Sequence, residues 1–199
     1  DPNLDVLGGG HQKLVEAGIP VIGNLGESER PGLNDGFFFR ANKGRPRIRI
    51  KVAMSLDGRS ALQNGESKWI TGPESRAEVQ KLRAQSCAIL TGIGTVRADD
   101  PRLNVRDPSC ETYGRQPDRI VLDSDLKIGT NCSILEGEGK TRIFTCKKEL
   151  EKERFLQAKG IEIIEIAREK GKLDLMSVVD VLKASRYNDI LVEAGPSLT

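Results

Sequence analysis

Short apolar segments alternate with longer amphipathic ones from Arg47 to the end of this chain of 199 residues. The apolar segments are too short for helices and rich in isoleucine, valine and leucine, as buried strands are. The segments between them carry helix-start features, such as Pro73 and Glu74. The expected strands are 47–54, 87–92, 118–124, 141–146, 161–166 and 189–195, and the expected helices 71–86, 147–160 and 174–187. This alternation predicts an α/β fold with a mostly parallel sheet flanked by helices.

The first 44 residues follow a different, loop-rich pattern. They predict a short helix at 11–18 and a strand at 19–25. This helix–strand unit has no earlier strands to complete a sheet, so we expect it to be the tail of another domain. The basic stretch from Arg40 to Pro46 contains glycine and proline and is the expected linker. Because the chain starts without methionine and stops just after a Gly-Pro turn, we expect a fragment at both ends.

Composition excludes several classes of function. The net charge is +2 and the basic residues are interleaved with acids, which argues against a nucleic-acid or membrane surface. No apolar run approaches the roughly 20 residues of a membrane span. A zinc site needs three or four converging ligands, and no cysteines here are spaced as Cys-x-x-Cys. We expect no metal in this chain and reduced thiols in the cytoplasm; the residues concerned are His11, Cys87, Cys110, Cys132 and Cys146.

Ligands of parallel sheets bind beyond the carboxyl ends of the strands, and polar residues gather at those positions. After one expected strand comes Gly92-Ile93-Gly94-Thr95, which is either an anion-binding nest or a plain tight turn. Another strand ends at Glu193 and is followed by Gly195 and Pro196, which resemble a helix start. Such a helix N-terminus favours phosphate, although a capped helix beside a surface glutamate gives the same pattern.

Three cationic residues stand out near these strand ends. Arg83 borders the apolar stripe of its helix, and Arg106 ends an extended segment. Two converging arginines suit a phosphate dianion, but two unrelated surface arginines are the alternative. Lys51 lies inside the first strand among apolar neighbours. It either points into the crevice or pairs with a carboxylate there, or it is exposed on an edge strand.

Four motifs occur in order: "KVAMSLDGRSALQNGESKWITG", "LRAQSCAILTGIGTVRADDPRLNVR", "RIVLDS" and "LVEAGPSL". Together they resemble the reductase domain of the bifunctional riboflavin-biosynthesis deaminase/reductase. The resemblance implies a dihydrofolate-reductase-like fold for 45–199, with the reductase domain incomplete at its C-terminus. It also implies that 1–44 are the C-terminal tail of a cytidine-deaminase-like pyrimidine deaminase domain. The zinc motif of that deaminase is absent here, so zinc would belong only to the missing portion.

The resemblance also implies a reaction and a set of site residues. The family reductase uses NADPH to reduce the ribosyl group of 5-amino-6-(5-phosphoribosylamino)uracil to a ribityl chain, and we expect a homo-oligomer. Lys51 matches the lysine next to the sugar and is the catalytic candidate. The substrate would contact Ser67, Arg83, Leu103, Arg106 and Glu193. The cofactor would contact Ala53, Trp69, Thr95, Asp99, Ser124 and the loop from Gly195.

Two other functions remain open at this point. A dihydrofolate-reductase-like oxidoreductase acting on another substrate would have the same fold, but a substrate without phosphate would not need both arginines. A nucleotide-binding remnant without catalysis would bind NADPH and not oxidise it. In the polar segment after the first strand, we expect Ser67 to face the sugar and Asp57 to pair with Arg59.

Overall fold

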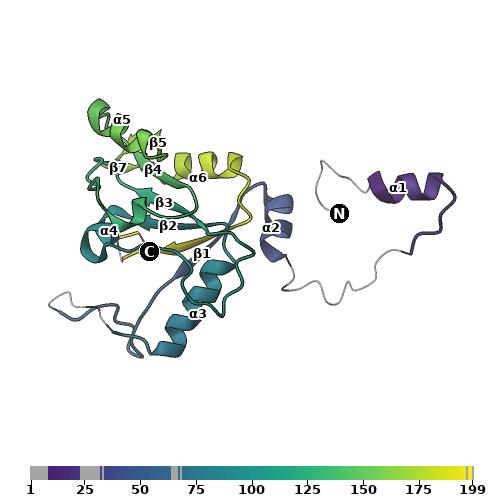
Figure 1. Ribbon diagram of the computed structural model, residues 1–199, viewed down its shortest axis with the longest axis horizontal. Helices are drawn as coiled ribbons and strands as arrows, with labels where there is room; N and C mark the ends of the chain where they lie inside the picture. The colour runs from purple at the N-terminus through teal and green to yellow at the C-terminus, as the bar shows by residue number, and fades with distance from the viewer. Residues whose placement is uncertain are drawn as a thin grey trace.

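The computed structural model describes residues 9–22, 32, 34–63, 67, 69–195 and 197–198. A six-stranded sheet, parallel throughout, forms its centre, in the order β1-β8-β2-β3-β4-β5 (Figure 1). Its strands are β1 Arg47–Lys51, β2 Ala88–Gly92, β3 Asp118–Leu122, β4 Thr141–Thr145, β5 Glu162–Glu165 and β8 Asp189–Glu193. The helices are α1 Gly9–Glu16, α2 Asp35–Lys43, α3 Pro73–Ala84, α4 Ile93–Asp99, α5 Leu150–Ala158 and α6 Leu175–Ala184, with a 3-10 turn η2 at Ser133–Leu135. The expected mostly parallel α/β fold is confirmed.

The central strands β8, β2, β3 and β4 are buried on both faces, as expected for parallel strands joined by helices. Alternate residues of the central strands point to opposite faces and build two separate cores. On one face Ile190 and Phe144 pack with Leu182 of α6. On the other face Ile89 packs with Val96 of α4 and Leu156 of α5. All five residues of β8 are buried, so the last strand in sequence lies inside the sheet rather than at its edge.

The position of β8 is the topological feature that builds the site. The chain leaves a gap between β1 and β2, and β8 later fills it with parallel pairing on both sides. Strands β2 to β5 then follow in sequence order away from this point. The carboxyl ends of β1, β8 and β2 therefore meet, which is where a doubly covered sheet binds ligands.

Several elements differ from the expectations. The first strand ends at Lys51 instead of residue 54, and 19–22 form no strand; 23–25 lie outside the described residues. Gly92-Ile93-Gly94-Thr95 is no loop, because α4 begins directly at Ile93. The hairpin of β6 Arg168–Glu169 and β7 Lys172–Leu173 was not expected. Gly195, Ser197 and Leu198 are described without a helix, and the rest of that expected helix start lies outside the described residues.

Helix α2 also departs from the expected linker. The helix runs to Lys43, and Gly44 closes it with φ of 65°, a left-handed conformation that suits glycine. Its start and middle are attached to the beginning of the strands: Asp35 pairs with Arg47 at 2.9 Å, and Arg40 Nε donates to Asn188 Oδ1 at 2.8 Å. Gly36 packs so closely on Asp189 that a Cβ there would overlap the carboxylate. Helix α2 is therefore packed on the sheet, at the end opposite the carboxyl ends.

Among the helices of the described ranges, none has the length and apolar character needed to cross a membrane.

Candidate active site

Lys51 and Glu193 lie side by side at the carboxyl ends of β1 and β8. They are register partners in the parallel pair, and Lys51 Nζ is 3.7 Å from Glu193 Oε2. The Glu193 side chain is only 8% exposed and that of Lys51 is 29% exposed. Since β1 is an edge strand of the described sheet, the two readings of Lys51 both apply. It lies on an edge strand, and it pairs with the carboxylate of Glu193 at the carboxyl ends of the strands.

Arg83 reaches the same carboxylate from α3. Its Nε donates to Glu193 Oε1 at 2.6 Å, and its Nη2 donates to Oε2 at 3.0 Å. This is the two-point geometry that a planar guanidinium forms with a carboxylate, and both side chains are buried. The Arg83 side chain therefore does not extend to water, and its guanidinium group is bonded to Glu193. It fixes the orientation of Glu193 toward Lys51.

Arg106 joins the cluster through Asn104. Arg106 Nη1 donates to Asn104 Oδ1 at 3.1 Å, and Arg83 Nη1 donates to the backbone carbonyl of Asn104 at 3.0 Å. The pKa of Arg106 is lowered by partial burial and then by the nearby charges of Arg83 and Arg102. The two arginines thus converge, which is the first of the two alternatives considered for them.

The charges of this cluster do not cancel. Lys51, Arg83 and Arg106 carry three positive charges, and Glu193 carries one negative charge. Two net positive charges remain at the carboxyl ends of the strands, which matches the charge of a phosphate monoester dianion. The residues that form this cluster, called the strand-end cluster below, are Lys51, Arg83, Asn104, Arg106 and Glu193.

Leu103 contributes its backbone and not its side chain to this region. The side chain is 3% exposed and packs in the core beside α4. Its φ of 48° is left-handed, a conformation that costs about 1 kcal/mol for a residue with a side chain. Any ligand contact of Leu103 is therefore through backbone atoms, and the turn it makes aims Asn104 at the two arginines.

Residues expected on the cofactor lie along the ends of β1, β2, β3 and β8. Thr95 is half-buried in the first turn of α4, while Asp99 is exposed at its end. Ala53 follows β1 and is half-buried, and Gly195 follows β8 and is exposed. Among the described residues, a Cβ built on Gly94 or Gly195 meets no other atom within 4 Å. The described structure therefore leaves space beside the Cα atoms of these two glycines.

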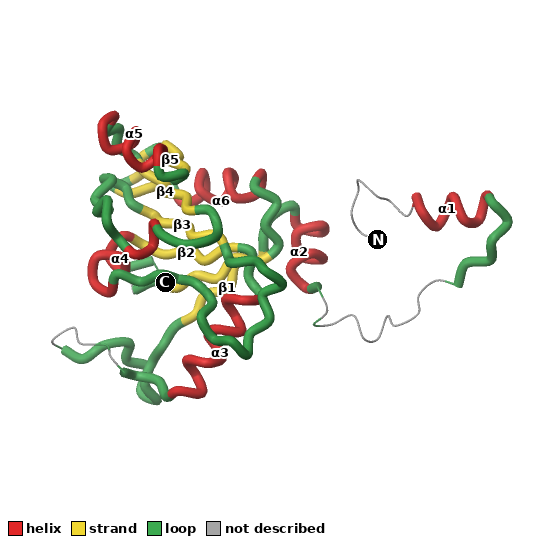
Figure 2. Tube along the Cα trace, in the orientation of Figure 1, coloured by secondary structure: helices red, strands yellow, loops and turns green. Residues whose placement is uncertain are grey.

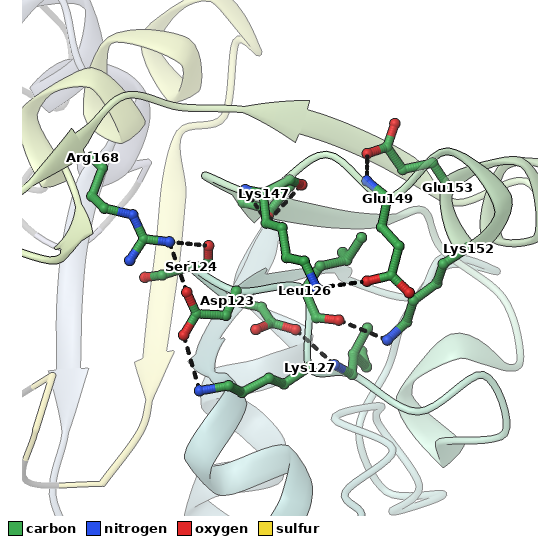
Figure 3. A network of polar contacts seen from close by, with 12 residues as sticks. Asp123, Ser124, Leu126, Lys127, Lys147, Glu149, Lys152, Glu153 and Arg168 are labelled. Atoms are coloured by element: carbon green, nitrogen blue, oxygen red, sulfur yellow. Dashed lines mark hydrogen bonds and ion pairs between the residues drawn. The ribbon is translucent and has the colours of Figure 1, made fainter.

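Ser124 lies beyond β3, in a network of polar contacts separate from the strand-end cluster (Figure 3). Its Oγ accepts from Leu173 N at 3.2 Å, and its carbonyl accepts from Arg168 Nη2 at 3.2 Å. Arg168 also pairs with Asp125 at 2.7 Å, which ties the β6–β7 hairpin to the end of β3. A hydroxyl that accepts one bond still has its own hydrogen to donate, so Ser124 can contact a ligand in this arrangement.

Ser67 and Trp69 lie between β1 and α3 in the sequence. The described parts of that segment extend below β1 in the view of Figure 2. Ser67 is exposed, and the 75% exposed Trp69 ring has Arg76 Cζ 4.5 Å from its centroid. Their contacts with substrate and cofactor stay predictions. The expected pair of Asp57 and Arg59 is confirmed, at 2.9 Å.

Three polar groups near the strand ends are not among the expected site residues, although the sequence places them at or after the ends of expected strands. Asn104 has no motif signal beyond its place in "DDPRLNVR". Thr91 Oγ1 and Asp123 Oδ1 are buried, and neither has a hydrogen-bond partner in the described part of the chain. Buried polar atoms without partners are uncommon, and both residues are completely buried. The described residues include no group of three or more His, Cys, Asp or Glu arranged to hold a metal.

Comparison with known proteins gives one consistent result. Residues 46–199 match the RibD C-terminal domain family. The chain is 42% identical over its whole length to the riboflavin biosynthesis protein RibD of Escherichia coli, of which it covers 55%. The solved structure of Acinetobacter baumannii RibD superposes with a TM-score of 0.84 at 38% identity, covering 100% of this chain and 53% of that one.

A second solved structure agrees. It is a Thermotoga maritima protein described as a diaminohydroxyphosphoribosylaminopyrimidine deaminase/5-amino-6-(5-phosphoribosylamino)uracil reductase, with a TM-score of 0.78 and 31% identity. The match covers 98% of this chain and 51% of the Thermotoga maritima chain. The chain thus spans about half the length of the relatives it matches. Its fold is the dihydrofolate-reductase-like fold of these relatives' reductase domains, and the chain belongs to the RibD C-terminal domain family.

Proposed function

We propose that this chain is the reductase part of a riboflavin-biosynthesis enzyme, which reduces the ribosyl group of 5-amino-6-(5-phosphoribosylamino)uracil to a ribityl chain. The strand-end cluster carries this proposal. Its two net positive charges suit the phosphate of the substrate, and Glu193 can accept hydrogen bonds from sugar hydroxyls. The names of the relatives support the same reaction, since one is described as the reductase of this compound.

NADPH is the cofactor of the proposed reaction, and the chain has groups that fit it. Gly94 has no side chain, and a Cβ there would meet none of the described atoms within 4 Å, so a phosphate or ribose can approach the backbone closely. Thr95, Asp99, Ser124 and Ala53 would hold the cofactor along the strand ends, and Trp69 would contact it from the segment between β1 and α3. When bound, NADPH supplies the hydride.

The protein's own part is to position the sugar and to stabilise charge. Reduction of the ring-opened imine adds hydride at sugar C1 and requires a proton at the nitrogen. We assign to the Lys51 ammonium group the polarisation of that imine, with Glu193 holding Lys51 at 3.7 Å and Arg83 holding Glu193. Arg106 and the free edge of Arg83 would bind the phosphate, so that C1 lies beside Lys51.

The test is NADPH oxidation by the full-length protein with the deaminated phosphoribosylamino-pyrimidine, followed through the near-ultraviolet absorbance of the reduced nicotinamide. We expect turnover that requires the phosphate of the substrate and yields the ribitylamino product. NADPH binding without oxidation would contradict the proposal and favour a non-catalytic remnant. Equal turnover of a substrate without phosphate would favour a different oxidoreductase. A parallel assay with NADH decides the choice of nicotinamide cofactor.

Three further properties of the intact protein belong to this proposal. An upstream zinc deaminase would precede residue 45, with 1–44 as its tail, since a relative is described as both deaminase and reductase. The substrate is a small phosphorylated pyrimidine, and we expect neither nucleic acid nor membrane as partner. A homo-oligomer in the cytoplasm is proposed; the four cysteines are free thiols, which suits a reducing compartment. Light scattering of the full-length protein measures the oligomeric state.

A further inference from the structure

Asn104 contacts both arginines of the strand-end cluster with two different atoms. Its backbone carbonyl accepts from Arg83 Nη1 at 3.0 Å, and its side-chain Oδ1 accepts from Arg106 Nη1 at 3.1 Å. A single residue thus sets the separation of two guanidinium groups whose charges repel each other. Neither contact removes positive charge, because an amide is neutral.

The segment that carries Asn104 is held in place from both sides. Gln116 bonds both backbone groups of Val105, accepting from its N at 2.8 Å and donating to its O at 3.1 Å. Gln80 Oε1 accepts from the Arg106 backbone N at 2.8 Å. The left-handed turn at Leu103 precedes this stretch. Asn104 is therefore presented on a rigid backbone, as a residue that orients others must be.

Each arginine keeps donors for a ligand. Arg83 uses three of its five N–H groups on Glu193 and Asn104, and Arg106 uses one side-chain N–H on Asn104, counting the contacts with described residues. The remaining N–H groups of both arginines are left to donate to an anion. A neutral acceptor at position 104 holds the pair without competing for that anion, whereas a carboxylate there would neutralise Arg106.

We propose that Asn104 is the positioning residue that sets the two-arginine site for a phosphate monoester, and that its neutrality is required for this role. The inference rests on the proposed function for the identity of the natural ligand. The binding of an anion by the two arginines follows from their contacts alone, whatever the natural ligand is. The inference predicts that aspartate, the replacement most similar in size to asparagine, weakens phosphate binding more than alanine does.

The experiment compares Asn104→Asp with Asn104→Ala in the full-length protein. Aspartate has the size of asparagine and keeps a bond to Arg106, so a merely structural role predicts that Asn104→Asp is milder than Asn104→Ala. Our inference predicts the reverse. Affinity for ribose 5-phosphate, measured by calorimetry, should fall about tenfold in Asn104→Ala and about a hundredfold in Asn104→Asp, with unphosphorylated ribose as the comparison ligand. Asn131→Asp, in an exposed turn outside the cluster, adds the same charge as a matched control and should bind as the original protein does.

Kinetics supply the second measurement. With the proposed substrate, both variants should raise KM in the same order while kcat changes less, because Lys51 and Glu193 are untouched. Equal affinities in the original protein and both variants, or Asn104→Asp milder than Asn104→Ala, would overturn the inference even if turnover is normal. Absence of turnover in the original protein, with the expected order of ribose 5-phosphate affinities, would instead remove the proposed function and leave the inference standing.

Discussion

Lys51 and Glu193 face each other across the pairing of β1 and β8, with Nζ and Oε2 3.7 Å apart. One residue ends the first strand of the sheet and the other ends the last. Arg83 bonds both oxygens of the same carboxylate, so Glu193 contacts two cations. This arrangement makes Glu193 the hub of the cluster and leaves Lys51 nearest to the edge of the sheet.

Replacement of Lys51 by methionine should abolish most turnover and leave the fold intact. Methionine has a similar length and removes only the ammonium group, while Glu193 keeps its two bonds to Arg83. Loss of a group that assists proton transfer or stabilises developing charge slows reactions by about 10²–10⁴. The measurement is kcat for NADPH oxidation, with Lys183→Met on the exposed face of α6 as the control. Full turnover of Lys51→Met would exclude this role.

The two partners of the buried ion pair should differ in their cost of removal. In Arg83→Met, Glu193 still has Lys51 as a cationic partner, whereas Glu193→Leu leaves Arg83, Lys51 and Arg106 without their carboxylate. Breaking a buried pair costs about 3–5 kcal/mol, so we expect Glu193→Leu near the upper value and Arg83→Met near or below the lower one. Urea denaturation measures both free energies of unfolding.

The control for that pair is Arg59→Met. Arg59 pairs with Asp57 at 2.9 Å, and its side chain is 75% exposed. An exposed pair contributes about 0–1 kcal/mol, so this variant should unfold almost as the original protein does. If Arg83→Met and Glu193→Leu lower the free energy of unfolding equally, Lys51 does not stabilise the Glu193 carboxylate once Arg83 is removed.

Gly94→Ala should weaken cofactor binding without loss of stability. Gly94 lies inside α4, and a Cβ there meets no atom within 4 Å, so alanine should stabilise the helix by up to about 1 kcal/mol. The same methyl group would occupy space proposed for NADPH. Fluorescence titration with NADPH and a thermal melt measure the two effects. Unchanged NADPH affinity would remove Gly94 from the proposed cofactor site.

Gly36→Ala is the contrasting variant. Its Cβ would overlap the Asp189 carboxylate, so the melting temperature should fall while NADPH affinity, at the other end of the sheet, stays the same. This result would also show that α2 is packed on the sheet in solution.

The attachment of the β6–β7 hairpin should weaken in acid. Arg168 and then Lys127 lower the pKa of Asp125 to about 2, well below the usual aspartate value of about 4. Between these two values the unfolded chain binds the proton more readily than the folded one, so stability from Asp125 is present above about pH 4 and is lost as the pH falls toward 2. The difference in unfolding free energy between the original protein and Asp125→Asn should therefore shrink over this range. A difference that is constant from pH 5 to pH 2 would contradict the shift.

Local patterns in the sequence were sufficient to predict where most strands of the sheet lie along the chain. The strands at 87–92, 118–124, 141–146, 161–166 and 189–195 were predicted within about two residues, because short aliphatic runs between turn residues have few other solutions. Pro73 correctly marked the start of α3, since its fixed φ and missing N–H suit a first turn. The convergence of Arg83 and Arg106 was one of two alternatives that the residues allowed.

Only the tertiary structure decided which of these residues meet. The insertion of β8 between β1 and β2 is a long-range choice that no local period encodes, and it brings Glu193 to Lys51. The same holds for the packing of α2 on the start of β1 and β8 and for the contact of Asn104 with both arginines. Periodicity reports which face of an element is buried. The partner of a buried charge depends on which strands become neighbours, and in this protein β8 becomes the neighbour of both β1 and β2.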